Sequence, residues 1–323
     1  MRIVVTGGAG FIGGSIVSQL VDRGDRVVAL VRDPDKAASL AESNVELVAS
    51  DLSETAAMAE QLRGADALIH GAGSYKVGIT AAERPAMWEA NVGTTERVLA
   101  AAKAAGTPRV AYVSTVGIFG DTHGREVDET YRRDPKDGFL SWYDETKFRA
   151  HEVAEAAIAG GAPVVIAQPG QVYGPGDHTQ IGEILGDAYR GTLRYVALAE
   201  VALEMAHVDD TAAGIIAALD HGRVGEAYVV AGEPHTLESA VAVAARVGGH
   251  KPPRMTVPTG LLRAMAPIND RLGGLPGMPA DLRETIKAAQ ASFLASHDKA
   301  ARELGFAPRS LEQGIVDTFG VHS

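Results

Sequence analysis

Tyr143 and Lys147 stand four residues apart in a stretch of good helix formers. On a helix this spacing places both side chains on one face. A phenol has a pKa of about 10 and is a poor acid–base catalyst near neutral pH, whereas a neighbouring ammonium group favours the phenolate and lowers that pKa. The pair therefore predicts proton transfer by Tyr143, with Lys147 lowering the pKa of the phenol.

Two hydroxyl residues, Ser114 and Thr115, follow one another at the end of an apolar run. If this run is a strand of a parallel sheet, both hydroxyls lie at the carboxyl edge, where such sheets bind their ligands. A hydroxyl at this place can bond a substrate carbonyl oxygen and stabilise developing negative charge. Together with the tyrosine and the lysine, these residues predict a catalytic site.

A glycine-rich segment follows the first apolar run of the chain. Gly7, Gly10 and Gly13 are spaced G-x-x-G-x-x-G. Such glycines permit a tight turn, let backbone amides approach a pyrophosphate, and allow the next helix to pack on the strand. The first turn of that helix, which contains Phe11 and Ile12, presents free N–H groups and the positive end of the helix dipole. The pattern predicts a dinucleotide cofactor at this turn.

The end of the second apolar run bears on the choice of cofactor. Proteins that prefer NAD usually carry an acidic residue there, which bonds the ribose hydroxyls. Val31 occupies this place in the chain, and Arg32 follows it. Because a guanidinium group can pair with a 2′-phosphate, the sequence favours NADP. NAD stays an alternative, since Asp33 can still reach a ribose hydroxyl.

Short β-branched runs alternate with longer alanine-rich stretches through the first half of the chain. Continuous apolar strands separated by helices predict a parallel sheet covered on both faces, which is a doubly wound α/β fold of the Rossmann type. The predicted strands are Ile3–Val5, Arg26–Val31, Val45–Val48, Ala67–His70, Arg109–Ser114, Val164–Gln168 and Ala227–Ala231. The predicted helices are Phe11–Arg23, Pro34–Ala41, Glu54–Leu62, Pro85–Ala105 and Tyr143–Ala159.

The pattern changes after Pro169, where glycine, proline and loose helical periodicity dominate. We expect residues 1–175 to form the NAD(P)-binding Rossmann domain, with residues 203–232 returning to it. Residues 176–323 are expected to form a smaller, mostly helical substrate-binding cap.

Composition limits the partners of the chain. Its 323 residues carry a formal charge of -11, so we expect neither nucleic acid nor a membrane as a partner. There is no cysteine, which excludes disulfides, thiolate metal sites and cysteine nucleophiles, and no metal site is expected. The first apolar run stops at Thr6, too early for a signal peptide, and no long uncharged apolar stretch is present. We expect a cytoplasmic protein.

Taken together, these motifs resemble the extended short-chain dehydrogenase/reductase superfamily, which contains NAD-dependent nucleotide-sugar epimerases, dehydratases and dihydroflavonol reductases. The similarity runs nearly from one end of the chain to the other. The matching segments are Thr6–Gly13, Asp51-Leu52, His70–Gly73, Asn91–Thr94, Val113–Thr115, the pair Tyr143/Lys147, Pro169–Gly176 and His207–Asp210.

The resemblance assigns further roles. It implies that Thr115 rather than Ser114 is the catalytic hydroxyl, and that Asn91 supports the site. It also implies a homodimer formed through the helices that contain residues 98–105 and 153–159. The implied cofactor contacts are Asp51 and Leu52 at the adenine, Ala72 and Gly73 at the ribose and phosphates, Pro169 and Val172 at the nicotinamide, and Tyr143 and Lys147 at the nicotinamide ribose. Tyr75, Trp142 and Tyr173 are expected in the substrate pocket.

Two reactions compete. Val31–Pro34 and Ser296–Ala300 resemble the dihydroflavonol reductases. An epimerase would have to hold a substrate diphosphate, whereas the presumed substrate region becomes apolar over residues 196–203. Gln171 also stands where many sugar-nucleotide enzymes carry asparagine. We therefore favour an NADP(H)-dependent oxidoreductase that reduces a ketone or aldehyde of a small organic substrate, with Tyr143 as proton donor.

The alternative is a nucleotide-sugar epimerase that uses tightly bound NAD(P). A dehydratase is disfavoured because Val116 and Gly117 follow Thr115, where several dehydratases place acidic residues. A non-catalytic regulator that binds NADP is a minor alternative, since such proteins often lose the tyrosine–lysine pair, which is present here.

Overall fold

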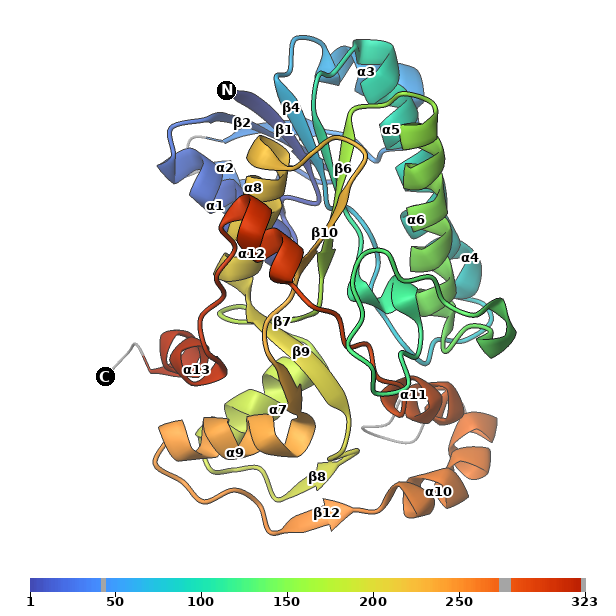
Figure 1. The fold of residues 1–323 in the computed structure, drawn as a ribbon, viewed down its shortest axis with the longest axis vertical. Coiled ribbons are helices and arrows are strands. Elements are labelled where there is room, and N and C mark those ends of the chain that lie inside the picture. Colours follow the sequence, from blue (N-terminus) through green and yellow to red (C-terminus); the bar gives the residue numbers. More distant parts are fainter. Residues whose placement is uncertain (42–44, 273–279, 321–323) are drawn as a thin grey trace.

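Seven parallel strands form the central sheet of the computed structural model, which describes residues 1–41, 45–272 and 280–320 (Figure 1). The strands are β1 (Arg2–Thr6), β2 (Arg26–Val31), β3 (Glu46–Ala49), β4 (Ala67–His70), β5 (Val110–Val113), β6 (Val164–Pro169) and β10 (Ala227–Val230). Their order is β10-β6-β5-β4-β1-β2-β3. The predicted doubly wound α/β fold is confirmed, and each of the seven predicted strands ends within one residue of the observed one.

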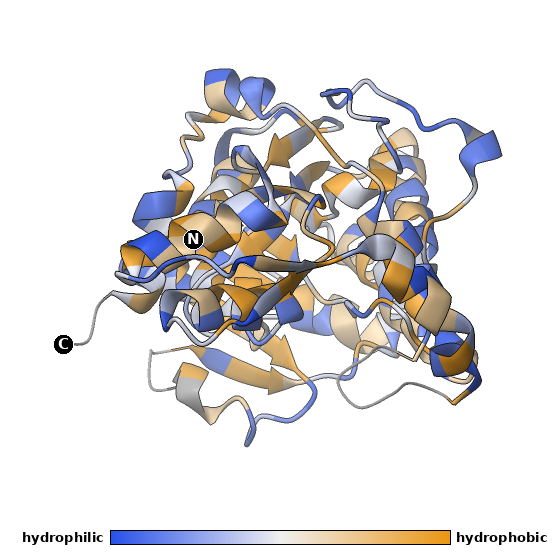
Figure 2. Cartoon of the chain, turned by 90° about the horizontal axis from the view of Figure 1, so that it is seen from below, coloured by the Kyte–Doolittle hydropathy of each residue, from blue (hydrophilic) through white to orange (hydrophobic). Residues whose placement is uncertain are grey.

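Helices cover both faces of this sheet because the strands are apolar on both sides. Ile3 and Val5 face one layer of helices, and Val4 faces the other. The first layer consists of α1 (Phe11–Asp22), α8 (Val208–His221) and α12 (Asp298–Leu304), and the second of α3 (Thr55–Leu62), α5 (Thr94–Ala105) and α6 (Trp142–Ala159). In Figure 2 the strands are mostly hydrophobic, whereas the helices around them carry both colours.

Two predicted helices differ from the observed ones. The predicted helix Pro34–Ala41 is reduced to α2 (Ala38–Ala41). The carboxylate of Asp33 accepts the Lys36 N–H, and this hydrogen bond forms a turn before α2. The second is divided into α4 (Arg84–Trp88) and α5 by a π-helical turn at Glu89–Gly93. Such turns are frequent at functional sites.

The second half of the chain contains two small sheets that the predicted, mostly helical cap did not include. β7 (Gln171–Tyr173), β9 (Ala202–His207) and β11 (Pro234–Thr236) form one, and β8 (Tyr195–Ala197) pairs with β12 (Met255–Val257). Most of these strands are three residues long, too short for a period of two to be recognised. The helices of this part are α7 (Gln180–Tyr189), α9 (Leu237–Val247), α10 (Thr259–Arg271), α11 (Leu282–Ala289) and α13 (Leu311–Phe319).

The chain passes between the two parts of the molecule more than once. α8 and β10 belong to the main sheet and its helices, whereas β9, just before them, lies in the small three-stranded sheet. α12 also packs on α8 and β10, although it lies within the predicted cap range 176–323. In Figure 1 the main sheet occupies the upper part of the molecule, and the small sheets with α9 and α10 lie below it.

Candidate active site

The turn between β1 and α1 packs closely on its surroundings because its glycines lack side chains. Gly7 adopts a φ of +77°, and a Cβ atom there would come within 2.7 Å of the Ala72 nitrogen. A Cβ atom on Gly13 would collide with the Gly7 carbonyl oxygen. Gly10 caps α1 without a side-chain hydrogen bond, and no acidic residue stands in the first turn of this fully described helix. The turn therefore fits a diphosphate.

Further residues expected at the cofactor lie around this turn. Phe11 and Ile12 form the first turn of α1. Arg32 lies exposed at the end of β2, and among the described residues it has no hydrogen-bond or ion-pair partner. Asp33 is paired with Lys36, with 3.2 Å between the charged atoms. Arg32 is thus free to bind an anion.

The loop after β3 has an unusual backbone conformation. Leu52 is buried with a φ of +60°, and its carbonyl accepts a hydrogen bond of 2.8 Å from the Arg97 side chain. The carboxylate of Asp51 accepts hydrogen bonds from the Ser53 hydroxyl and N–H, which lower the pKa of Asp51. A leucine in the left-handed region is strained, and such residues cluster at functional sites.

The other residues expected at the cofactor lie at the carboxyl ends of strands. Ala72 and Gly73 follow β4, and a Cβ atom on Gly73 would come within 3.1 Å of the Asn91 side chain. Pro169 ends β6, and Val172 is buried in β7. The topology of the parallel sheet therefore brings these segments and the glycine turn to one edge.

Tyr143 and Lys147 lie in the first two turns of α6, which begins after Ser141. The Ser141 hydroxyl accepts the Asp144 N–H at 3.0 Å and caps the helix. Burial raises the pKa of Tyr143 above 10, and the neighbouring Tyr75 phenol raises it further. Near neutral pH the Tyr143 phenol is therefore protonated.

Lys147 has a hydrogen-bond partner on β5. Its ammonium group donates a hydrogen bond of 3.0 Å to the Val113 carbonyl. Burial lowers the pKa of Lys147 itself to about 8. Burial has the largest effect on the pKa of Tyr143 in the folded chain, so the lowering of this pKa by Lys147 stays a prediction.

The two adjacent hydroxyls point to different partners. A hydrogen bond with the Thr115 side chain lowers the pKa of Tyr143, against the larger effect of burial. The Ser114 hydroxyl is buried and bonds His151 at 2.9 Å. The structure therefore brings Thr115, and not Ser114, together with the phenol.

Asn91 connects the catalytic helix to the loop after β4. Its side-chain oxygen accepts the Ser74 N–H at 2.7 Å, and its amide nitrogen donates to the Thr146 hydroxyl at 2.9 Å. Thr146 in turn donates to the Tyr143 carbonyl at 3.0 Å. The π-helical turn places this buried side chain between the two segments. The position of Thr146, three residues after Tyr143, was the only sequence signal for this link.

A buried ion pair was missed by the sequence analysis. Arg133 pairs with Asp144 through two hydrogen bonds of 2.7 and 3.0 Å, and both side chains are almost fully buried. The Arg133 guanidinium also lies over the rings of Phe139 and Phe148. This pair fixes the preceding loop to the first turn of α6, next to Tyr143.

Two of the expected substrate residues lie beside Tyr143. The Tyr75 ring meets the Tyr143 ring edge-on, with 4.8 Å between their centroids, and Tyr75 is 59% exposed. Trp142 precedes Tyr143 on α6, and its indole donates a hydrogen bond of 3.0 Å to the Arg84 carbonyl. Tyr75 therefore borders the phenol, whereas the Trp142 side chain packs toward α4.

Two expectations about the substrate region are corrected by the structure. Tyr173 is 1% exposed, packs edge-on against His207 and donates to the Leu311 carbonyl. It lines a small cavity of about 130 Å³ beside α7 and α13, which does not include Tyr143. The apolar residues of 196–203 also pack within the second part of the molecule or against α10 and α11. Their apolar character therefore reflects packing and says nothing about the substrate.

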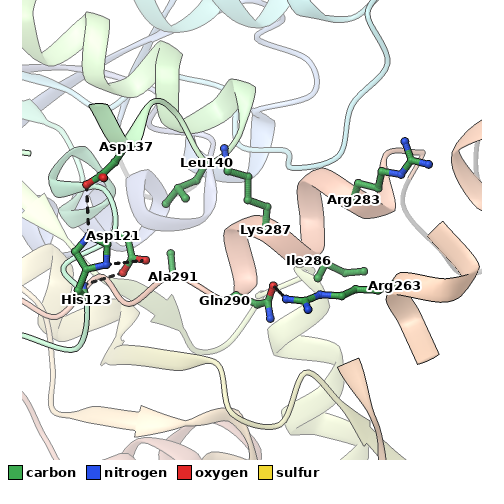
Figure 3. A pocket seen from close by; sticks show the side chains of 10 residues that line it. All are labelled: Asp121, His123, Asp137, Leu140, Arg263, Arg283, Ile286, Lys287, Gln290 and Ala291. Carbon is green, nitrogen blue, oxygen red and sulfur yellow. Dashed lines mark hydrogen bonds and ion pairs between the residues drawn. The ribbon is translucent and has the colours of Figure 1, made fainter. Parts of the chain in front are cut away.

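A separate cavity of about 490 Å³ lies between the loop before α6 and the helices α10 and α11 (Figure 3). His123 stands between Asp121 and Asp137 at one end, and Arg263 bonds Gln290 at the other. The cavity does not include Tyr143 or Thr115. It is therefore distinct from the site described above.

Comparisons with known proteins agree with this arrangement. The model of the NAD dependent epimerase/dehydratase family matches residues 3–231. A putative dihydroflavonol 4-reductase of a Synechocystis species is 30% identical, with 97% of this chain and 92% of that protein covered. The 4-hydroxy-2-methyl-3-oxo-4-farnesyl-3,4-dihydroquinoline-1-oxide ketoreductase of Stigmatella aurantiaca is 31% identical, with 98% and 95% covered.

The fold is also found among solved structures. The crystal structure of gox2253 superimposes with a TM-score of 0.85 at 31% identity, and the match covers 99% of this chain and 97% of that one. Within the described residues, no helix has the length and apolar character needed to cross a membrane.

Proposed function

Because the chain belongs to the NAD dependent epimerase/dehydratase family, we propose that it is an NADPH-dependent reductase of a ketone or aldehyde. The observation that carries the proposal is the protonated Tyr143 phenol beside the Thr115 hydroxyl, at the sheet edge that holds the glycine turn. The names of two relatives, a putative dihydroflavonol 4-reductase and a ketoreductase, support reduction.

Each residue of the site has a role in the proposed reaction. A bound nicotinamide cofactor supplies hydride to the carbonyl carbon. The Thr115 and Tyr143 hydroxyls hold the carbonyl oxygen, and Tyr143 donates its proton to that oxygen. Lys147, which is charged below a pH of about 8, favours the phenolate that remains. Asn91 and Thr146 keep α6 in register with the loop that bears Tyr75.

We assign the preference for NADPH to Arg32. Its exposed guanidinium group has no partner among the described residues and stands where the cofactor's 2′-phosphate is expected, whereas Asp33 is paired with Lys36. The glycine turn and the free amides of α1 would hold the diphosphate. We further propose a lipophilic ketone as substrate, since the name of one relative combines an oxo group with a farnesyl chain.

The decisive experiment follows NADPH and product together. Ketones, aldehydes and nucleotide sugars are offered to the purified protein, and product is measured against NADPH consumed. We expect stoichiometric oxidation of NADPH with a lipophilic ketone. Conversion of a nucleotide sugar at constant NADPH concentration would contradict the proposal and indicate an epimerase, which regenerates its cofactor in each cycle.

A further inference from the structure

The outer face of α10 exposes a row of apolar side chains. Leu261, Ile268 and Leu272 are 54%, 63% and 64% exposed. They are spaced by seven and four residues, so they lie in one line along α10 and the C-cap residue Leu272 that follows it. The opposite face is buried: Leu262 and Ala266 pack against α11 and the small two-stranded sheet. The row therefore has no partner within the described part of this chain.

Three unpaired cations lie near this row in the sequence, two before β12 and one at the end of α10. Lys251, Arg254 and Arg271 are exposed, and none has a hydrogen-bond or ion-pair partner among the described residues. Residues 250–290 contain six basic and three acidic residues, in a chain whose formal charge is -11. Two of the acidic side chains are engaged inward: Asp270 accepts the Leu282 N–H at 2.7 Å, and Glu284 accepts the Gly78 N–H at 3.1 Å. Residues 250–290 therefore carry a net positive charge.

We propose that this face of α10 docks on the surface of an anionic phospholipid bilayer. A helix with an apolar row flanked by lysine and arginine lies in the lipid interface, where the apolar side chains enter the acyl boundary and the cations meet the phosphates. A symmetric contact between two copies would bring these cations together, so the charge favours an anionic membrane over the same face of a second copy. The proposal departs from the expectation, based on net charge alone, that the protein avoids membranes.

The position of α10 connects this surface to the active site. α10 packs on α11, and α11 is held to the two loops that flank Tyr143. The Asp281 N–H donates to the Gly78 carbonyl at 3.1 Å, three residues after Tyr75, and Lys287 donates to the Phe139 carbonyl at 2.8 Å. In Figure 1, α10 and α11 lie at the lower end, below the loops of the main sheet. These bonds link the proposed docking face to the loops beside Tyr143.

The test measures binding of the full chain to vesicles, without cofactor or substrate, so that its outcome does not depend on the proposed reaction. Vesicles of phosphatidylcholine with about one third phosphatidylglycerol are compared with pure phosphatidylcholine by flotation. We expect binding to the anionic vesicles, which weakens as salt rises because the charges are screened.

Two triple variants separate the apolar and ionic contributions. Replacing Lys251, Arg254 and Arg271 by glutamine should lower the partition coefficient roughly 100-fold, since each basic side chain near an anionic surface contributes about fivefold. Replacing Leu261, Ile268 and Leu272 by serine should lower it at least about tenfold. Val224→Ser, at an exposed valine between α8 and β10, and Arg63→Gln, at an exposed arginine after α3, are the matched controls and should bind like the parent.

Thermal unfolding and the mass in light scattering are measured for every variant. The substitutions are at exposed positions, so an unchanged unfolding temperature is expected. The proposal is overturned if the parent binds neither kind of vesicle, or if both triple variants bind like the parent. If the parent does not bind vesicles and the Leu261/Ile268/Leu272 variant has a lower mass than the parent, this face is instead a contact between copies.

Discussion

Tyr143 is the side chain on which the proposed proton transfer depends. Tyr143→Phe removes the transferable proton and keeps the ring, so the edge-on contact with Tyr75 should persist. We expect turnover to fall by roughly two to four orders of magnitude, the usual loss for a positioned general acid. Tyr195→Phe, at an exposed tyrosine of β8, is the matched control. Turnover within tenfold of the parent would show that another group supplies the proton.

Arg32 is the residue that we expect to distinguish the two cofactors. Arg32→Ala should weaken binding of NADPH by roughly tenfold or more and leave NADH almost unaffected, because only NADPH carries the 2′-phosphate that a guanidinium group bonds. Calorimetry with both cofactors measures this preference. Arg26→Ala is the control, since this arginine begins the same strand at the opposite edge of the sheet. Equal affinity of the parent for NADH and NADPH would contradict the assignment.

The segment between α11 and α12 joins three parts of the molecule. The Val127 N–H bonds the Leu294 carbonyl at 3.0 Å, and the Ser296 N–H bonds the Val127 carbonyl at 2.7 Å. The Ala295 N–H between these two residues donates to the carboxylate of Glu204 on β9. Glu204 is only 5% exposed, and its other carboxylate oxygen has no partner. Burial raises the pKa of Glu204 from 4.5 to about 8.

Glu204 should make the stability of the fold depend on pH. The unfolded chain loses this proton near pH 4.5, whereas the folded chain keeps it up to about pH 8. Stability therefore falls as the pH rises between these values, by at most about 1.4 kcal/mol per pH unit. Glu204→Gln removes the titration and keeps an acceptor for the Ala295 N–H, so the variant should gain stability over the parent from pH 5 to pH 8.

Urea unfolding at both pH values measures this effect. Glu200→Gln, at an exposed glutamate just before β9, is the control and should follow the parent. If the difference in unfolding free energy between Glu204→Gln and the parent is the same at pH 5 and pH 8, the raised pKa is refuted.

At the scale of the whole molecule, we propose a homodimer through α5 and α6. These helices cover one face of the sheet and lie together at the side of the molecule in Figure 1. Their outer faces carry small residues, among them the exposed Ala100 and Ala156. Small side chains let two helix pairs approach closely, and no charge has to be buried at these positions.

The double variant Ala100→Arg/Ala156→Arg should therefore be monomeric. Light scattering should give about twice the chain mass of 33.6 kDa for the parent and about this mass for the variant. Ala301→Arg, at an exposed position of α12, should stay dimeric. A parent that is monomeric at micromolar concentration would refute the dimer.

Local sequence patterns predicted much of the fold and part of the candidate site. The seven strands follow from apolar runs, and the glycine turn from the spacing of Gly7, Gly10 and Gly13, because both depend on neighbours along the backbone. The spacing of Tyr143 and Lys147 likewise placed them on one helix. Their shared position at the sheet edge followed from the parallel topology, which alternating strands and helices predict.

What the sequence could not decide depends on contacts between distant segments. Tyr173 was expected at the substrate, but it packs against His207 and α13 and lines a different, smaller cavity. The Lys147 ammonium group on α6 donates to the Val113 carbonyl of β5, which is distant in the sequence. The raised pKa of Glu204 and the outward face of α10 likewise arise only when the chain is folded. Burial and desolvation are properties of the whole packed molecule, and no local spacing encodes them.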